Sequence, residues 1–162
     1  MADDLQSPVP SVEKPHGRFA GKLDDKGRLK LPVNFQEYLK SFGAQKFFVT
    51  SLDRHLAQIY PMPVWQQNEK FFAEFTENPE VAENVKFNAD DLGADAEMDS
   101  QGRITFNTDL RRELDLEGQD LHLFAHDGRV EIYSEVAYQA RKRQAQQTPG
   151  KDVTFLKSKG LK

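Results

Sequence analysis

Two stretches of this sequence share one short pattern. Residues 23–32 read LDDKGRLKLP, and residues 98–107 read MDSQGRITFN. In each stretch an Asp is followed three positions later by Gly-Arg, and polar and apolar residues then alternate. Alternation with a period of two is typical of a half-buried β-strand, so each stretch predicts a tight turn that leads into a strand. One explanation has to serve both copies.

The similarity between the two regions extends beyond this pattern. An offset of 75 residues aligns Asp24 with Asp99, and a slip of two residues occurs further on. The other aligned positions are apolar: Phe35 and Leu110, Leu39 and Leu114, Ile59-Tyr60 and Ile132-Tyr133, Trp65 and Tyr138. We interpret this as an internal duplication of about 45 residues.

Each copy predicts the same series of elements: a strand, a turn, a second strand, a short amphipathic helix and an apolar hairpin. The first strand is expected over residues 19–23. The apolar positions of the second strands are expected to point inward: Leu29, Leu31, Ile104 and Phe106. Asp127-Gly128 is a strong hairpin signal. Further helices are predicted over residues 63–75 and 136–144.

The Asp and Gly of the pattern are explained by the turn alone. Gly27 and Gly102 suit a positive φ, where a side chain would be strained. Asp24 and Asp99 can accept backbone N–H bonds across the turn and hold its shape. These four residues are therefore predicted to shape the turns, with no further role required of them.

The turn does not explain the Arg that follows it in both copies. Arg28 and Arg103 are expected on the outward face, where each could be solvated, could pair with its own Asp, or could bind an anion. Three lysines flank the first copy. The candidate anion-binding residues are therefore Arg28, Lys26, Lys30, Lys22 and Arg103.

The net charge of −4 conceals a strong polarisation along the 162 residues. Residues 17–60 hold 8 basic and 4 acidic residues (+4), whereas residues 66–100 hold 2 and 10 (−8). Residues 141–162 hold 7 and 1 (+6). Basic patches on an acidic protein can steer a polyanion to one face. The absence of Cys excludes disulfides, a thiolate nucleophile and a Cys-based zinc site.

Several segments lie outside the duplicated units. Residues 1–16 contain three Pro and predict a disordered leader, and residues 66–92 predict a helical acidic connector. The acid-rich stretch 88–99 is interpreted as a solvated linker rather than a calcium loop. Residues 141–162 predict a basic flexible tail, which either attracts phosphate non-specifically or only aids solubility. Acids near the N-terminus and the lack of a long apolar run predict a soluble, cytoplasmic protein.

The chain resembles the MraZ family over about residues 17–140. Three stretches carry the resemblance: LDDKGRLKLP, IYPMPVW (59–65) and MDSQGRITFN. It implies an α+β fold, in which two AbrB-like swapped-hairpin units (17–65 and 93–140) form a pseudo-symmetric β-barrel with flanking helices. It also implies a ring-like homo-oligomer that binds direct repeats in double-stranded DNA as a transcriptional regulator of the division and cell-wall gene cluster. The implied DNA contacts are Asp24 to Arg28 and Asp99 to Arg103.

Two functions are therefore weighed. The first is a nucleoid-associated DNA-binding regulator, in which Arg28 contributes more than Arg103 because acids precede the second motif. The alternative is an oligomeric protein-interaction module whose Arg turns bind acidic partners. We expect no enzyme activity, cofactor, membrane partner or small-molecule substrate. His122 and His126 would lie about 13 Å apart along a strand, too far to share a metal ion.

Overall fold

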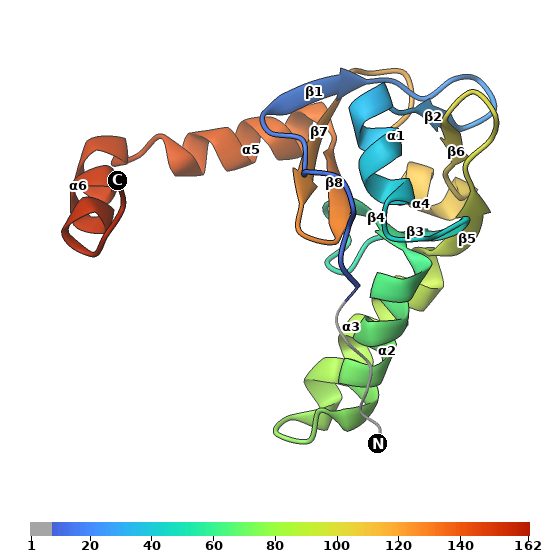
Figure 1. Cartoon of the computed structure of the whole chain (residues 1–162), viewed down its shortest axis with the longest axis horizontal. Coiled ribbons are helices and arrows are strands. Elements are labelled where there is room, and N and C mark those ends of the chain that lie inside the picture. Colours follow the sequence, from blue (N-terminus) through green and yellow to red (C-terminus); the bar gives the residue numbers. More distant parts are fainter. Residues whose placement is uncertain (1–7) are drawn as a thin grey trace.

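A computed structural model of the chain describes residues 8–162 (Figure 1). The first part of the expected leader, residues 1–7, lies outside the described residues, and residues 8–16 contain no helix or strand. The first unit contains β1 (Arg18–Gly21), β2 (Arg28–Lys30), α1 (Val33–Lys40), β3 (Lys46–Thr50) and β4 (Ala57–Pro61). The second unit repeats the series with β5 (Ala94–Glu97), β6 (Arg103–Thr105), α4 (Thr108–Glu113), β7 (Leu121–His126) and β8 (Arg129–Tyr133).

The strands form a six-stranded antiparallel sheet and a separate two-stranded ribbon. The sheet order is β1-β7-β8-β4-β3-β5, and the ribbon pairs β2 with β6. This order reads the same from both ends when the two units are exchanged. Each unit lends its first strand to the hairpin of the other unit, because β1 pairs with β7 and β5 pairs with β3. Neither unit therefore builds its sheet alone.

The predicted α+β class is confirmed, and two details need correction or remain open. The strand expected over residues 19–23 ends at Gly21, and Leu23 makes only an isolated bridge to Leu29 as the chain enters the turn. Hydrogen bonds do not close the six-stranded sheet, whose outer strands are β1 and β5. The closed pseudo-symmetric barrel thus stays a prediction.

One apolar core is shared by both units. Leu29 of β2 and Ile104 of β6 are completely buried beneath the ribbon, as the alternating pattern predicts. Phe35 of α1 and Leu110 of α4, which the duplication aligns, are also completely buried. The same pattern of burial in both copies shows that the short helices α1 and α4 cover one common interior.

A helical hairpin follows the first unit and projects away from the sheet (Figure 1). It consists of α2 (Met62–Glu74) and α3 (Pro79–Leu92). Trp65 of α2 packs on Phe48, with ring centroids 4.6 Å apart, and the Oγ1 of Thr50 donates to the carbonyl of Ala89 on α3. Packing and hydrogen bonding therefore hold both helices against β3.

The acid-rich stretch 88–99 is not the solvated linker expected from its composition. It contains the end of α3 and the strand β5, which pairs with β3 at the edge of the sheet. In β5 the half-buried Ala94 and Ala96 alternate with the exposed Asp95 and Glu97. The alternation, rather than the acid content, decides the structure.

The C-terminal region forms a second projecting arm. It contains α5 (Glu135–Ala145), which matches the predicted helix, and α6 (Pro149–Ser158). A polar network ties α5 to the sheet: Arg18 bonds Nδ1 of His122 at 3.0 Å, and Nε2 of His122 meets Glu135 at 2.7 Å. The basic tail thus contains a helix that the sequence analysis did not predict, and its flexibility stays a prediction. No helix in the described part of the chain is long and apolar enough to cross a bilayer.

A buried hydroxyl connects α1 to the turn between β7 and β8. The Tyr38 hydroxyl donates to the carbonyl of His126 at 2.8 Å and accepts from the N–H of Gly128 at 3.1 Å. We predict that Tyr38→Phe lowers the free energy of unfolding by about 1–3 kcal/mol, because the His126 carbonyl and the Gly128 N–H then lose their buried hydrogen-bond partner. Urea unfolding measures the change.

Tyr133→Phe is the matched control for this substitution. The Tyr133 side chain is also buried, but its hydroxyl makes no hydrogen bond to another described residue. Its removal should change stability much less. Equal unfolding midpoints for the two variants would show that the Tyr38 hydroxyl does not hold the turn.

Candidate functional site

The ribbon places the two arginines of the repeated pattern on one surface. In β2 and β6, Arg28 lies opposite Thr105, and Lys30 lies opposite Arg103. Two further backbone bonds extend the ribbon, from Leu31 N–H to the Gly102 carbonyl (3.1 Å) and from Phe106 N–H to the Gly27 carbonyl (2.8 Å). Since Leu29 and Ile104 face the core, the other four side chains share the outer face.

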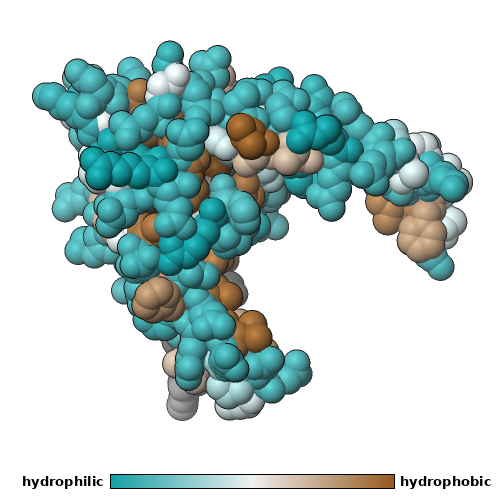
Figure 2. All heavy atoms as spheres, turned by 180° about the vertical axis from the view of Figure 1, so that it is seen from behind, coloured by the Kyte–Doolittle hydropathy of each residue, from teal (hydrophilic) through white to brown (hydrophobic). Residues whose placement is uncertain are grey.

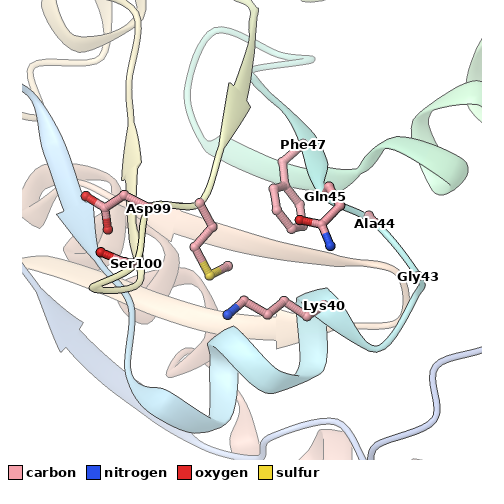
Figure 3. Close-up of a pocket in the computed structure, with 8 residues that line it drawn as sticks. Lys40, Gly43, Ala44, Gln45, Phe47, Asp99 and Ser100 are labelled. Carbon is pink, nitrogen blue, oxygen red and sulfur yellow. The ribbon is translucent and has the colours of Figure 1, made fainter.

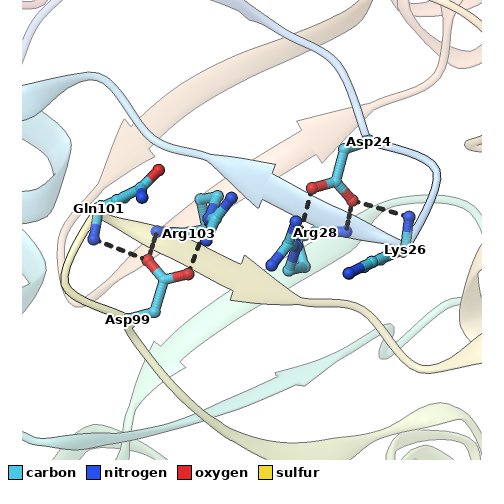
Figure 4. Close-up of polar contacts among 6 residues, drawn as sticks. All are labelled: Asp24, Lys26, Arg28, Asp99, Gln101 and Arg103. Carbon is cyan, nitrogen blue, oxygen red and sulfur yellow. Dashed lines mark hydrogen bonds and ion pairs between the residues drawn. The ribbon is translucent and has the colours of Figure 1, made fainter.

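Each arginine is held by the Asp of its own turn, in the same geometry twice (Figure 4). One oxygen of Asp24 accepts hydrogen bonds from the backbone N–H groups of Lys26 (3.0 Å) and Arg28 (2.9 Å). The other oxygen accepts a hydrogen bond from Arg28 Nε at 2.8 Å. Asp99 repeats these bonds with Gln101 N–H (2.9 Å), Arg103 N–H (2.9 Å) and Arg103 Nε (2.7 Å). The predicted turn-shaping role of both aspartates agrees with these bonds.

The glycines of the two turns are required by conformation and by space. Gly27 has φ +77° and Gly102 has φ +78°, in the left-handed region that side chains disfavour. A Cβ on Gly27 would also lie only 2.6 Å from Arg111 Cζ, and one on Gly102 would run into the amide of Gln36. Both predicted turn glycines therefore occupy positions that only Gly fills without strain.

Gln36 and Arg111 are site residues that sequence reasoning missed. Gln36 Nε2 donates to the Leu31 carbonyl at 2.7 Å, and Arg111 Nε donates to the Phe106 carbonyl at 2.9 Å. Each side chain thus braces the end of a ribbon strand from the following helix. The signal was present in the sequence, because the 75-residue offset that aligns the turns also aligns these two polar residues.

The Asp–Arg pairs leave part of each guanidinium available. Arg28 and Arg103 side chains are 27% and 25% exposed. Only Nε of each is bonded to its Asp, and within residues 8–162 no hydrogen bond reaches the Nη nitrogens. The ion pair that the sequence left open as an alternative is therefore present, and it orients each guanidinium without using all of its donors.

Both carboxylates have a lowered pKa. The N–H of Arg28 lowers the pKa of Asp24 below its ordinary value, with a further contribution from the Arg28 side chain. The N–H of Arg103 lowers the pKa of Asp99 in the same way. Since both shifts are downward, the stabilisation is complete above the ordinary Asp pKa of 3.8 and is lost as the pH falls through the lowered value.

The lysines are distributed differently from the sequence expectation. Lys22, Lys26 and Lys30 are all exposed. The sequence grouped Lys30 with Arg28 alone, but in the ribbon Lys30 is the direct cross-strand neighbour of Arg103. The residue opposite Arg28 is Thr105, which was not a candidate. Lys30 therefore adds positive charge to both arginines.

The remaining asymmetry between the two turns lies in their flanks. With the 75-residue offset, Lys22 corresponds to Glu97, Asp25 to Ser100 and Lys26 to Gln101. The flanks of the first turn therefore carry two basic residues and one acidic residue, whereas those of the second carry one acidic and two neutral residues. The two arginines have the same geometry in different electrostatic surroundings.

Other polar groups do not converge into a second site. A cavity of about 360 Å³ lies between the end of α1 and the second turn, and Lys40 and Asp99 are among the residues that line it (Figure 3). Within residues 8–162, no group of three or more His, Asp or Glu residues is placed to hold a metal ion. His122 is bound by Arg18 and Glu135, and His126 pairs separately with Glu131.

Substitutions at Asp24 separate the two roles of its carboxylate. Asp24→Asn keeps an oxygen for the two backbone N–H groups, but presents an NH₂ group to Arg28 Nε. Asp24→Ala removes all three bonds. We predict a larger fall in melting temperature for Asp24→Ala than for Asp24→Asn, and greater motion of the Arg28 side chain in both variants, measured by ¹⁵N relaxation at Nε. An unchanged Nε order parameter in Asp24→Asn would contradict the orienting role.

Comparison with known proteins places this geometry in a family. The family model described as "MraZ protein, putative antitoxin-like" matches residues 93–154. A protein named "Transcriptional regulator MraZ" in Acidobacterium capsulatum is 30% identical, over 75% of this chain and 83% of its own length. A protein of the same name in Desulfitobacterium hafniense is 30% identical, over 90% and 98%. Another in Koribacter versatilis is 33% identical, over 64% and 71%. With this identity over most of its length, the chain belongs to the MraZ family.

Proposed function

We propose that the chain is a DNA-binding transcriptional regulator, and that the outer face of the β2–β6 ribbon is its DNA-reading surface. The relatives named as transcriptional regulators support the general function. One structural observation carries the assignment of the surface. Two arginines on adjacent strands face the same way, each is oriented by an Asp, and their Nη donors are free within the described residues.

The shape of the ribbon suits the major groove of DNA. That groove admits a two-stranded β-ribbon, and Arg can donate two parallel hydrogen bonds to O6 and N7 of guanine. The Nη groups of Arg28 and Arg103 are the donors for such contacts, or for a phosphate oxygen. Lys30 and Thr105 complete the outer face, with one cationic donor and one hydroxyl between the arginines.

The flanking lysines supply attraction that does not depend on sequence. Lys22 and Lys26 are exposed beside the first turn, where they can approach the phosphate backbone. Neutralised phosphates release bound counterions, so affinity from these contacts falls steeply as salt rises. The acidic charge of residues 66–100 disfavours an approach of the duplex from that side.

The finer parts of the proposal follow from the small size of the reading surface. One ribbon offers only a few contacts, so we propose that a ring-like homo-oligomer arrays several ribbons along direct repeats near promoters of the division and cell-wall genes. In each subunit the units 17–65 and 93–140 form the pseudo-symmetric barrel, with the ribbon at the gap between β1 and β5. Binding to promoters also implies association with the nucleoid.

Fluorescence anisotropy with duplexes from the region upstream of the chain's own gene tests this function. We expect saturable binding at low salt that is tighter than on a scrambled duplex and weakens steeply with ionic strength. The same titration with acidic peptides that carry the same net charge as the duplex tests the alternative, a protein-interaction module. Binding to the peptides with none to any duplex would overturn the proposal in favour of that alternative.

Substitution of the two arginines tests the reading surface. We predict that Arg28→Ala nearly abolishes specific binding and that Arg103→Ala weakens it modestly, because only the first turn has basic flanks. One lost base contact costs about 1–3 kcal/mol, and several copies in a ring would compound the loss. Titrations on cognate and scrambled duplexes at two salt concentrations measure the effect.

Thermal melts and oligomer mass are the controls, and neither should change much because each turn keeps its Asp and Gly. Equal losses in Arg28→Ala and Arg103→Ala would show that the electrostatic flanks are irrelevant. Wild-type affinity in Arg28→Ala would remove the ribbon as the reading surface.

A further inference from the structure

The C-terminal helix α6 carries apolar side chains that its own chain leaves uncovered. Val153, Phe155 and Leu156 are 45%, 61% and 51% exposed, and no residue of the helix is buried. Figure 2 shows brown, hydrophobic spheres gathered at the far end of this arm. An isolated helix shorter than about 12–15 residues is marginal in water. The 10-residue α6 therefore needs a partner surface.

The charge around these side chains indicates what kind of surface it needs. Residues 149–162 carry four Lys and one Asp, a balance of +3. Lys159 Nζ lies 5.6 Å from the centroid of the Phe155 ring, so a cation sits directly beside the apolar group. A surface that matches α6 is apolar in the middle and acidic at its rim.

A surface with both properties lies on the α2–α3 hairpin of the same chain. A groove of about 310 Å³ runs between the two helices. Its wall is formed by Phe72, Ala73, Phe75, Pro79 and Ala82, with Glu69, Glu83 and Lys86, and Lys86 is paired with Asp90. Residues 62–92 carry seven acidic and two basic residues, a balance of −5. The groove therefore complements α6 in both polarity and charge.

The two surfaces do not meet within one molecule. Figures 1 and 2 show the α2–α3 hairpin and the α5–α6 arm leaving the sheet in different directions, with an open gap between them. Folding α6 back onto its own unit is also unfavourable. The groove beside Tyr138 is lined by Arg141 and Lys142, so the basic helix would meet like charge there.

We propose that α6 of one copy docks in the α2–α3 groove of a second copy, with Phe155 and Leu156 over the apolar wall and the lysines of α6 near Glu69 and Glu83. Two different surfaces of the chain meet in this contact, so it is heterologous and repeats into a closed ring or an open filament. The inference rests on the self-assembly in the proposed function, and supplies the interface for it.

Light scattering of the full-length chain without DNA is the first test. We expect the wild-type mass to be a multiple of 18.5 kDa and Leu156→Asp to return a mass near 18.5 kDa. Because Leu156 is exposed, its replacement should not unfold the subunit, which circular dichroism checks. Val33→Asp is the matched control, since Val33 is 66% exposed on α1, outside both surfaces. A monomeric wild type, or an unchanged mass in Leu156→Asp, would overturn the inference.

A mixing experiment tests which surfaces meet. The Glu69→Lys/Glu83→Lys chain keeps a functional α6 but has a repulsive groove, whereas Leu156→Asp keeps the groove but loses the helix contact. We expect each to be monomeric alone and the mixture to form a one-to-one complex of twice the subunit mass. If α6 docks on another surface of a second copy, the Glu69→Lys/Glu83→Lys chain assembles alone and the groove assignment is wrong. If α6 docks on its own chain, the mixture stays monomeric.

Charge exchange and DNA binding complete the test. Lys157→Glu/Lys159→Glu should lower the mass, and its combination with Glu69→Lys/Glu83→Lys in one chain should restore the large assembly. A Leu156→Asp chain that keeps its mass but loses affinity for all duplexes would show instead that the tail binds phosphate. Arg28→Ala, which we expect to lose specific DNA binding, should keep the wild-type mass. Assembly and DNA binding can therefore be tested separately, and either proposal can fail without the other.

Discussion

The pairing of β2 with β6 is the interaction on which the proposed reading surface depends. Each strand has three residues, and each comes from a different unit. Such a short two-stranded ribbon is not stable alone in water. It persists because Leu29 and Ile104 are completely buried beneath it. A slip of one residue in a strand would turn its buried residue outward and its Arg inward, so the core fixes which side chains face outward.

The aspartate of each turn adds orientation to this register. One oxygen of Asp24 fixes the backbone of the turn, and the other fixes Arg28 Nε. A guanidinium held in this way loses less side-chain freedom when it binds, which favours affinity. The carboxylate also reduces the local positive charge. Arg28 is therefore well oriented, but it attracts distant phosphates less strongly. Exposed lysines beside the turn can restore that attraction.

The sequence predicted those parts of the structure that depend on local pattern. Alternation predicted the ribbon strands, and the repeated Asp-x-x-Gly-Arg predicted two equal turns. Cross-strand neighbours were not predictable, because the partner of Lys30 depends on how β2 meets β6. The bracing by Gln36 and Arg111 was missed because polar residues on short helices usually face water. The repeat predicted a first strand in the second unit, but the composition of residues 88–99 predicted a linker, because the acids of β5 obscured the alternating Ala94 and Ala96.

The two units differ most in the helices that follow them. In the first unit Phe48 and Tyr60 are paired on the sheet, and Trp65 and α3 cover them. The corresponding pair in the second unit is His122 and Tyr133. There Tyr138 of α5 stacks on His122 with ring centroids 3.9 Å apart, and a polar bond from His122 to Glu135 adds to this contact. Since α5 alone makes both the ring stacking and the polar bond to His122, the second unit does not need α6 over it. A basic helix released in this way from an acidic chain is suited to reach another molecule.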